Sequence, residues 1–269
     1  MAETKLNILP VPTFASLGVN HVIRDISGYK NENIVVDESR SKSAVQYIDN
    51  DTETNVEVRK GAKLKLIQLF DSRKRIVSKL GISLADNADI ELIQLYLGGD
   101  TVSEIITKLD GAKSVFNAKI GYQLADEEKL DINLIAEHTG TKSTSEIMVN
   151  GVLNDSAAKT FKGTIDFKYG AVGAAGNEKE DVMLMSDKVR NKTVPVILCA
   201  EEDVVGNHGA TIGRIDEKHV FYMKSRGISE EKIYELMARS KLAQIIAPID
   251  DESALKRIYN TLGWGEEIE

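Results

Sequence analysis

The chain contains two neighbouring runs that decide its fold class, Val204-Val205-Gly206-Asn207-His208-Gly209-Ala210-Thr211-Ile212-Gly213-Arg214-Ile215 and, shortly after, Phe221-Tyr222-Met223-Lys224-Ser225-Arg226-Gly227-Ile228. Glycine interrupts both runs, and glycine is favoured where the backbone turns tightly or lets another group approach closely. We interpret the two runs as short extended segments that close on a turn, after which a helix begins.

Upstream of these runs, residues 55–225 show the same kind of pattern. Short segments of alternating apolar and polar residues are separated by turns rich in Gly, Asn, Asp and Ser, which indicates many strands and few helices. A sandwich, a barrel or a solenoid would each produce this pattern, and no strict repeat period selects among them. The clearest segments are 56–58, 64–69, 90–97, 132–135, 146–149 and 161–169.

After Gly227 the spacing of apolar residues becomes helical. Ser229 is a suitable N-cap for a first helix, which Pro248 would end. A second helix is expected from Asp251 to a C-cap at Gly263. The apolar surface of this pair indicates a docking element or, equally, a cap over the open end of the core. Its residues are Ile233, Leu236, Met237, Ala243, Ile246 and Ala247 in the first helix, and Leu255, Ile258, Tyr259 and Leu262 in the second.

The N-terminal part of the chain is expected to be an arm rather than a domain. Pro10-Val11-Pro12 enforces extended backbone, and residues 37–55 are mostly polar or charged. We therefore divide the chain into an N-terminal arm (1–54), a strand-rich core (55–226) and a C-terminal helical segment (227–269).

Composition excludes several classes of function. Lys and Arg number 34 against 42 Asp and Glu, and the net charge of −8 argues against nucleic-acid binding. A single cysteine excludes an internal disulfide and any four-cysteine site within one chain. No apolar run reaches signal-peptide or membrane-spanning length, so we expect a cytoplasmic protein that does not bind membranes. The glycine-rich run 170–176 lacks dinucleotide-binding spacing and is expected to be a loop, and no Walker lysine follows any glycine run.

The two C-terminal runs closely resemble the signature of the SufB/SufD family of iron–sulfur cluster assembly proteins. The matching residues are His208-Gly209-Ala210-Thr211, then Phe221-Tyr222 and Ser225-Arg226-Gly227-Ile228, within a resemblance that extends over residues 115–245. The resemblance implies a mainly β fold: a right-handed parallel β-helix (single-stranded solenoid) core followed by a C-terminal α-helical segment. It also implies a scaffold or partner of an ATPase rather than an enzyme.

His208 is the first candidate site residue. It lies among small residues that would let a ligand approach, and a neutral imidazole is a competent ligand for iron. The resemblance implies that this position takes part in cluster assembly at a subunit interface, with iron or a transient iron–sulfur cluster bound there. The alternative is a hydrogen-bonded structural histidine. The sequence does not decide among iron, reduced flavin and neither.

Several residues bear on which branch of the family the chain resembles. Glu180 stands where SufB-like chains place their sulfur-receiving cysteine; it is a second candidate metal ligand, or else part of a solvated acidic turn. Gly209 replaces a glutamate of SufB-like chains, and Gly206 replaces a cysteine of many SufD-like chains. These departures favour a SufD-like or short SufBD-type member. The only thiol, Cys199, lies in an apolar run and is expected to be buried and inert in a strand covered on both faces.

Other family-matching positions are interpreted as structural. They include His138, Thr144 and Ser145 in the core. Val196 and Leu198 occupy positions that point outward in the family pattern, so this apolar pair is either an exposed patch or is covered by the N-terminal arm.

The resemblance therefore predicts a non-catalytic subunit of a SUF-type complex. Such a subunit would dock an ABC-type ATPase (SufC) through its C-terminal helices and pair through its β-helix with a SufB-like subunit or a second copy of itself, forming a dimer. A purely structural interaction protein without a metal role is the main alternative. A β-helix carbohydrate-active enzyme is disfavoured, because no strand face combines clustered carboxylates with a suitably spaced arginine. The residues expected to contact the ATPase are Ile233, Leu236, Met237, Ile246, Ile258 and Leu262.

Overall fold

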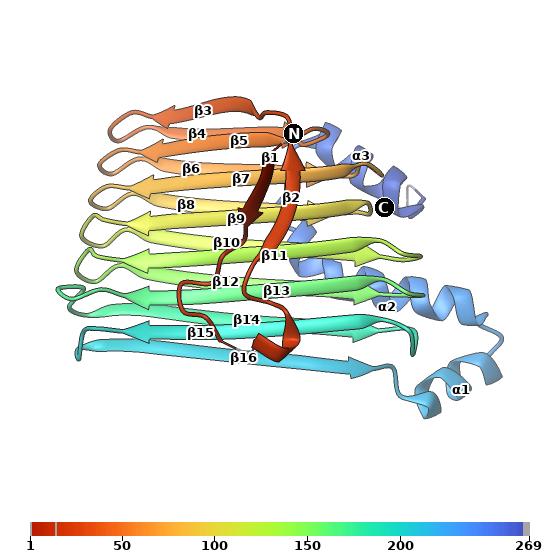
Figure 1. Ribbon diagram of the computed structural model, residues 1–269. Coiled ribbons are helices and arrows are strands. Elements are labelled where there is room, and N and C mark those ends of the chain that lie inside the picture. Colours follow the sequence, from red (N-terminus) through yellow and green to blue (C-terminus); the bar gives the residue numbers. More distant parts are fainter. Residues whose placement is uncertain (1, 14, 266–269) are drawn as a thin grey trace.

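The computed structural model describes residues 2–13 and 15–265, which form a parallel β-solenoid flanked by helices (Figure 1). Successive strands alternate between two seven-stranded sheets, one of even-numbered strands (β4 to β16) and one of odd-numbered strands (β3 to β15). The predicted fold class, a mainly β chain with a parallel β-helix core and C-terminal helices, is confirmed. The strands are β1 (Ala2–Leu6), β2 (Val22–Ile26), β3 (Lys30–Val36), β4 (Ser41–Tyr47), β5 (Thr52–Val58), β6 (Lys63–Phe70), β7 (Arg75–Leu84), β8 (Asp89–Tyr96), β9 (Asp100–Leu109), β10 (Val115–Leu124), β11 (Lys129–His138), β12 (Thr144–Leu153), β13 (Ala158–Phe167), β14 (Ala174–Leu184), β15 (Arg190–Cys199) and β16 (Val204–Arg214).

The space between the two sheets, here called the lumen, is filled by side chains from alternate strand positions. In β11, Leu130, Ile132 and Leu134 are buried in the lumen, whereas Lys129 faces solvent on the outer side. Because neighbouring strands are in parallel register, equivalent positions stack along the solenoid and form one continuous core. One odd-numbered strand and the following even-numbered strand make up one rung.

The corners between the strands of a rung explain why the sequence shows no strict repeat. Each of the first six corners contains one residue with φ between 55° and 73°, and the amide of that residue donates to a carbonyl of the next corner. Successive corner residues are separated by 22 residues at the start of the solenoid and by 31 at its end. The rungs lengthen along the chain, so no single period fits them. The corner residues are Ser39, Gly61, Asn87, Lys113, Lys142 and Gly173.

The solenoid begins earlier than the expected boundary at residue 55. Residues 30–54 are not part of an arm, since β3, β4 and the start of β5 are the first strands of the two sheets. The polar composition of this segment predicted a solvated arm. In the structure, however, several of its polar side chains point into the lumen and pair with one another. Gln46 donates to Glu32 at 2.5 Å, and Gln68 and Gln94 extend this ladder with hydrogen bonds of 2.7 Å.

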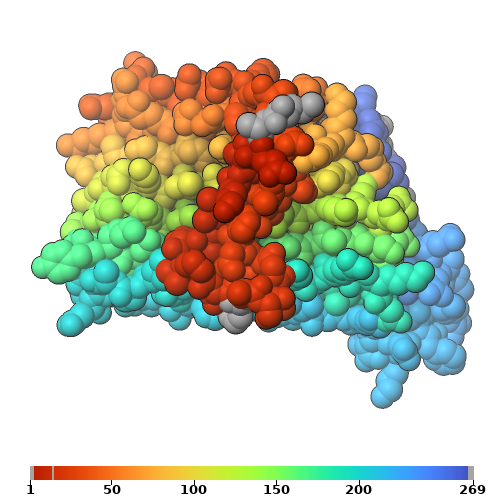
Figure 2. Space-filling model, viewed as in Figure 1, coloured from red at the N-terminus to blue at the C-terminus, as the bar shows by residue number. Residues whose placement is uncertain are grey.

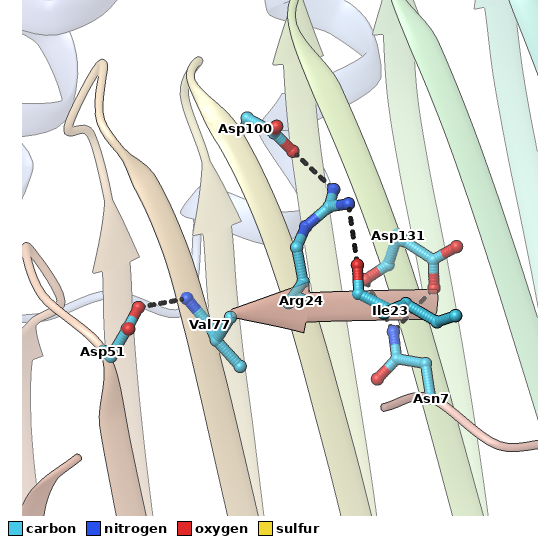
Figure 3. A network of polar contacts seen from close by, with 7 residues as sticks. All are labelled: Asn7, Ile23, Arg24, Asp51, Val77, Asp100 and Asp131. Carbon is cyan, nitrogen blue, oxygen red and sulfur yellow. Dashed lines mark hydrogen bonds and ion pairs between the residues drawn. The ribbon is translucent and has the colours of Figure 1, made fainter. Parts of the chain in front are cut away.

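The true N-terminal arm comprises β1, β2 and the residues that connect them, and we call it the strap. It crosses the outer face of the odd-numbered sheet, over strands that run across its direction (Figures 1 and 2). Asn7 Nδ2 donates to Asp131 Oδ1 at 2.6 Å, and Arg24 pairs with Asp100 at 3.0 Å (Figure 3). Polar contacts therefore hold the strap across the middle of the sheet.

Apolar contacts hold the two ends of the strap. Near β7 and β9, Leu6 is buried in a cluster with Val77 and Val102. Near β15, a second cluster joins Leu9, Val19, Val194 and Val196. Of the two alternatives for the outward apolar pair of β15, coverage by the N-terminal segment is thus confirmed for Val196, and Leu198 is half-buried.

The helices begin and end largely where the sequence places them. Ser229 caps α2 (Glu230–Ile246) by accepting from the amide of Lys232, and Asp251 caps α3 (Glu252–Leu262). Gly263 ends α3 with φ 66°. The run from Phe221 to Ser225 is the exception: it is helical, within α1 (Glu217–Ser225), because Asp216 provides an N-cap. The expected C-terminal segment also includes residues 266–269, which lie outside the described residues, as do residues 1 and 14 of the expected arm.

Helices α2 and α3 pack along the outer face of the even-numbered sheet rather than over the end of the solenoid (Figure 1). Leu242 and Ile245 of α2 approach β10 so closely that a Cβ at Gly121 would lie 3.2 and 3.1 Å from their methyl groups. This contact buries one face of each helix within the chain itself. Across residues 2–13 and 15–265, no helix is both long and apolar enough to cross a membrane.

Candidate functional site

The last rung of the solenoid is unpaired on its outer side. Within the described residues, β15 and β16 each have a partner on one side only, and β16 is exposed along almost its whole length. Register with β14 places His208 opposite Glu178 and Ala210 opposite Glu180. Since Glu178 and Glu180 are buried in the lumen, His208 belongs to the lumen side of the last rung, yet it is exposed because no further rung covers it.

Directly beneath this open end, the lumen contains a buried charged cluster. Lys159 of β13 and Glu180 of β14 form an ion pair in which both side chains are 0% exposed. Thr193 Oγ1 donates to Glu180 Oε2 at 2.6 Å and accepts from Lys159 Nζ at 3.2 Å. Tyr122 completes the cluster, and burial, followed by the charge of Glu180, raises the pKa of its hydroxyl well above the usual value. Burial likewise lowers the pKa of the Lys159 ammonium, against the opposing effect of Glu180.

The interpretation of Glu180 as part of a solvated turn is therefore wrong. It lies in the interior of a strand, and its two carboxylate oxygens are engaged by Lys159 and Thr193. In the strand register it stands opposite Ala210 and not opposite His208. No group of three or more His, Cys, Asp or Glu side chains in residues 2–13 and 15–265 is arranged to hold a metal ion.

Glu178, which is not among the predicted site residues, is a second carboxyl in the same part of the lumen. Glu178 is 5% exposed, and its carboxyl fills the space left by the missing side chain of Gly163, where a Cβ would lie 1.8 Å from Oε2. Burial, and then the neighbouring charge of Glu180, raises the pKa of Glu178 to about 8. The sequence could have indicated Glu178, because it lies two residues from Glu180 and residues two apart in a strand share one face.

His138 is structural, as predicted. Its Nδ1 lies 2.8 Å from the hydroxyl of Ser143 and its Nε2 lies 2.9 Å from that of Ser145. The ring is fully buried against Phe167, and burial lowers the pKa of His138 to about 4. Thr144 pairs with Val115 and Ala175 at the start of β12, within the sheet.

Cys199 is exposed, so the prediction of a buried thiol is wrong. Its run is apolar and its register with Phe167 is that of a lumen position, but it lies in the last rung, which no further strand among residues 2–13 and 15–265 covers. The thiol donates to the carbonyl oxygen of Glu201 at 3.0 Å. An alternating apolar pattern does not reveal that a strand is the last of its sheet.

We expect Cys199 to react with a thiol reagent such as DTNB in the native protein, because an accessible sulfur needs no unfolding to be reached. One thiol per chain should be modified, as rapidly with as without denaturant, and Cys199→Ser should abolish the reaction. A thiol that reacts only after unfolding would contradict the exposure seen in β15.

The residues expected to contact an ATPase fall into two groups. Ile246 and Ile258 are buried against the chain's own sheet, and Ile233 is also fully buried, so none of the three is accessible to a partner in this arrangement. Met237 and Leu262 are half-buried, and Leu236 is 42% exposed.

Helix α1 provides apolar surface that the prediction did not include. Phe221 and Tyr222 are 75% and 56% exposed. Beside them, a pocket of about 440 Å³ lies between α1, α2 and the ends of β14 and β16. Its lining includes three methionines, Met183, Met223 and Met237, whose flexible thioethers adapt to varied apolar shapes.

The fold defines a parallel β-helix protein whose last rung is unpaired within the described residues. The chain belongs to the SufB/SufD family, because the family model for "SUF system FeS cluster assembly, SufBD core domain" matches residues 27–241. This match begins close to the first solenoid strand and ends within α2.

Individual relatives agree with this assignment. The chain is 29% identical over 187 residues to the iron–sulfur cluster assembly protein SufD of Bacillus subtilis (strain 168), which covers 69% of this chain and 43% of that protein. It is 25% identical over 181 residues to SufD of Escherichia coli (strain K12), with coverages of 67% and 43%. It is 28% identical over 100 residues to SufB of Bacillus subtilis (strain 168), an alignment that covers 37% of this chain and 22% of that protein. The chain thus spans less than half the length of these curated relatives.

Proposed function

We propose that the chain is a non-catalytic subunit of a SUF-type iron–sulfur cluster assembly complex, located in the cytoplasm, that docks an ABC-type ATPase. The observation that carries the docking role is the exposure of Phe221 and Tyr222 on α1, beside the methionine-lined pocket, and of Leu236 on α2. One apolar face of α2 and α3 is already buried on the sheet, so it is not available to a partner. Family membership and the SufD relatives support the SUF role.

The unpaired last rung supports pairing with another subunit. On the side away from β14, strand β16 has no neighbouring strand among the described residues, and such an edge is a template for another chain. Gly209 and Gly213 leave open space beside it. The partner would be a SufB-like subunit or a second copy of this chain. Iron or a nascent cluster, as cargo, would then meet His208 at the junction of the two subunits.

A purely structural role without metal is the second candidate. The observation that favours it is that Glu180 is already paired with Lys159 and Thr193. On that view the lumen cluster only fills the interior of the last rungs.

We expect Leu236→Asp and Phe221→Asp each to weaken binding of the SUF ATPase by about 30-fold or more. Apolar anchors at the centre of an interface are worth about 2 kcal/mol or more each, and a carboxylate there is not solvated. Isothermal titration calorimetry on the mixed proteins measures the loss. Thermal unfolding of both variants should stay close to that of the wild type, since both side chains are exposed.

Leu17→Asp is the matched control, because Leu17 is similarly exposed at 46% but lies on the strap, on the opposite sheet. It should leave ATPase binding unchanged. Ile246→Asp, in contrast, is expected to destabilise the chain itself, since Ile246 is buried against the sheet. Unchanged affinity in both Leu236→Asp and Phe221→Asp would overturn the docking role of this surface.

A further inference from the structure

We propose that the strap opens and closes as one unit while the solenoid stays folded, and that the closed strap braces β15, an edge strand of the last rung. Opening is a property of the isolated chain and needs no partner. The bracing rests on the proposed function, because an ordered last rung is what a second subunit would pair with.

The strap is attached to the solenoid through side chains (Figure 3). Its strands β1 and β2 form an antiparallel sheet of their own, and among the described residues no backbone-to-backbone hydrogen bond joins the strap to either solenoid sheet. The bonds across the contact each use a side chain: Asn7 Nδ2 donates to Asp131, and Lys162 Nζ donates to the carbonyl oxygen of Asn7 at 3.1 Å. A unit with its own backbone ladder and only side-chain attachments is expected to detach as a whole.

The contact between the strap and the sheet is incompletely satisfied. Four buried polar atoms there have no described hydrogen-bond partner, namely Oδ1 of Asn7, Oδ1 of Asn133, Nε of Arg24 and the hydroxyl oxygen of Tyr29. A buried polar atom without a partner costs free energy, which is recovered when water reaches the atom. Lifting the strap is therefore less costly than separating two rungs, whose backbone groups are paired with one another.

The sheet face beneath the middle of the strap is polar. Lys162 is 0% exposed there and pairs with Asp131 at 2.7 Å. In the same strip, Glu104 accepts from the amide of Asn7 at 3.1 Å. These charged groups would be solvated once the strap lifts, so opening exposes little apolar surface in the middle. The two apolar clusters at the ends of the strap favour the closed state.

In its closed state the strap supports β15. Among the described strands, β15 is paired with β13 alone. Leu9 and Val19 of the strap, which are 2% and 1% exposed, pack on Val194 of β15. Lys192 of β15 also donates to the carbonyl oxygen of Leu17. Because the other end of the strap is anchored on β7 and β9, the closed strap ties the edge strand to the middle of the sheet.

Two buried lysines of β13 test the opening. Lys162 lies under the strap and Lys159 lies in the lumen, and both side chains are 0% exposed. Acetylation with an N-hydroxysuccinimide ester, followed by peptide mass spectrometry, measures the rate at which each amine is reached. If the strap opens by itself, Lys162 should be acetylated at least tenfold faster than Lys159. Equal rates at the two lysines would mean that both are reached by the same opening of the whole fold, and would overturn the proposal.

Asn7→Gly loosens the strap without straining it. Asn7 has φ 50°, a conformation that glycine adopts readily, so the substitution removes the side-chain bonds to Asp131 and keeps the backbone path. Acetylation of Lys162 should become at least fivefold faster, and that of Lys159 should not change. Val11→Ser is the matched control, because Val11 lies on the strap but is 47% exposed and should alter neither rate. An unchanged rate at Lys162 in Asn7→Gly would contradict the opening of the strap.

Amide hydrogen exchange tests the bracing. Leu9→Ser and Val19→Ser each weaken the apolar contact with β15, so the amides of β15 should exchange at least tenfold faster while those of β9 exchange as in the wild type. Protection of Lys159 from acetylation shows that the solenoid of each variant is still folded. The bracing role is wrong if β15 exchanges at the wild-type rate in both variants, or if β9 accelerates as much as β15. These experiments contain neither a second subunit nor an ATPase, so their outcome does not depend on whether the chain pairs or docks as proposed.

Discussion

Replacing Lys159 by methionine is expected to lower the free energy of unfolding by about 3–5 kcal/mol, the usual loss when one member of a buried ion pair is removed. The cost arises because Glu180, which is 0% exposed, would keep its charge in the lumen without the ammonium that neutralises it. Thr193 would still donate one hydrogen bond, which does not replace a charge. Urea unfolding at pH 7 measures the change.

The double variant Lys159→Met with Glu180→Met separates the ion pair from packing. Replacement of a whole buried pair by apolar side chains of similar size is often neutral or stabilising, so the double variant should recover most of the loss. Lys63→Met is the matched control, because Lys63 forms an exposed pair with Asp89 at 3.6 Å and should change stability by no more than about 0.5 kcal/mol. If the loss in the double variant equals the sum of the losses measured for Lys159→Met alone and Glu180→Met alone, the pair is not energetically coupled.

The same cluster shows where prediction from the sequence reaches its limit. The local sequence was sufficient to predict the helix caps Ser229, Asp251 and Gly263, because a cap depends on hydrogen bonds to residues three or four positions away. Lys159 and Glu180 find each other 21 residues apart in the chain, across the lumen. In its own stretch of sequence, each is indistinguishable from an ordinary solvated charge.

A related limit applies to whole segments. Residues 30–54 are polar and therefore predicted an arm. Their buried amides find hydrogen-bond partners only on neighbouring rungs, as in the ladder of Gln46, Gln68 and Gln94, and such partners are not visible in a local stretch of sequence. Cys199 looked buried because an apolar strand pattern is the same in the last rung as in the middle. The alternation that predicted strands could not distinguish a solenoid from a sandwich, and the family resemblance made that distinction correctly.

A third limit of prediction from the sequence concerns the helices. The apolar stripe of α2 was recognised, but the sequence does not tell which part of such a stripe contacts the chain itself. Leu242 and Ile246 cover the sheet, while Leu236 is exposed. Further exposed apolar side chains, Phe221 and Tyr222, lie on α1, although the sequence pattern predicts an extended segment there.

Acidification is expected to destabilise the protein through His138 by about 3 kcal/mol between pH 6.5 and pH 4. Burial lowers the pKa of His138 to about 4 in the folded chain, whereas an unfolded chain has a histidine pKa near 6.5. Between these values the unfolded state binds a proton that the native state does not, so the free energy of unfolding falls as the pH falls. The contribution is fully present above about pH 6.5.

His138→Gln isolates this effect, because an amide can still donate and accept between Ser143 and Ser145 but does not titrate. The variant should be less stable at pH 7.5, since it loses the ring contact with Phe167. The difference from the wild type should then shrink as the pH is lowered to 4.5, because only the wild type carries the cost of a neutral buried imidazole. The other three histidines of the chain are exposed, so they do not mask the comparison. Parallel stability curves for the two proteins over pH 4.5 to 7.5 would show that His138 takes up its proton in the folded state as readily as in the unfolded one, contrary to its burial between two hydroxyls.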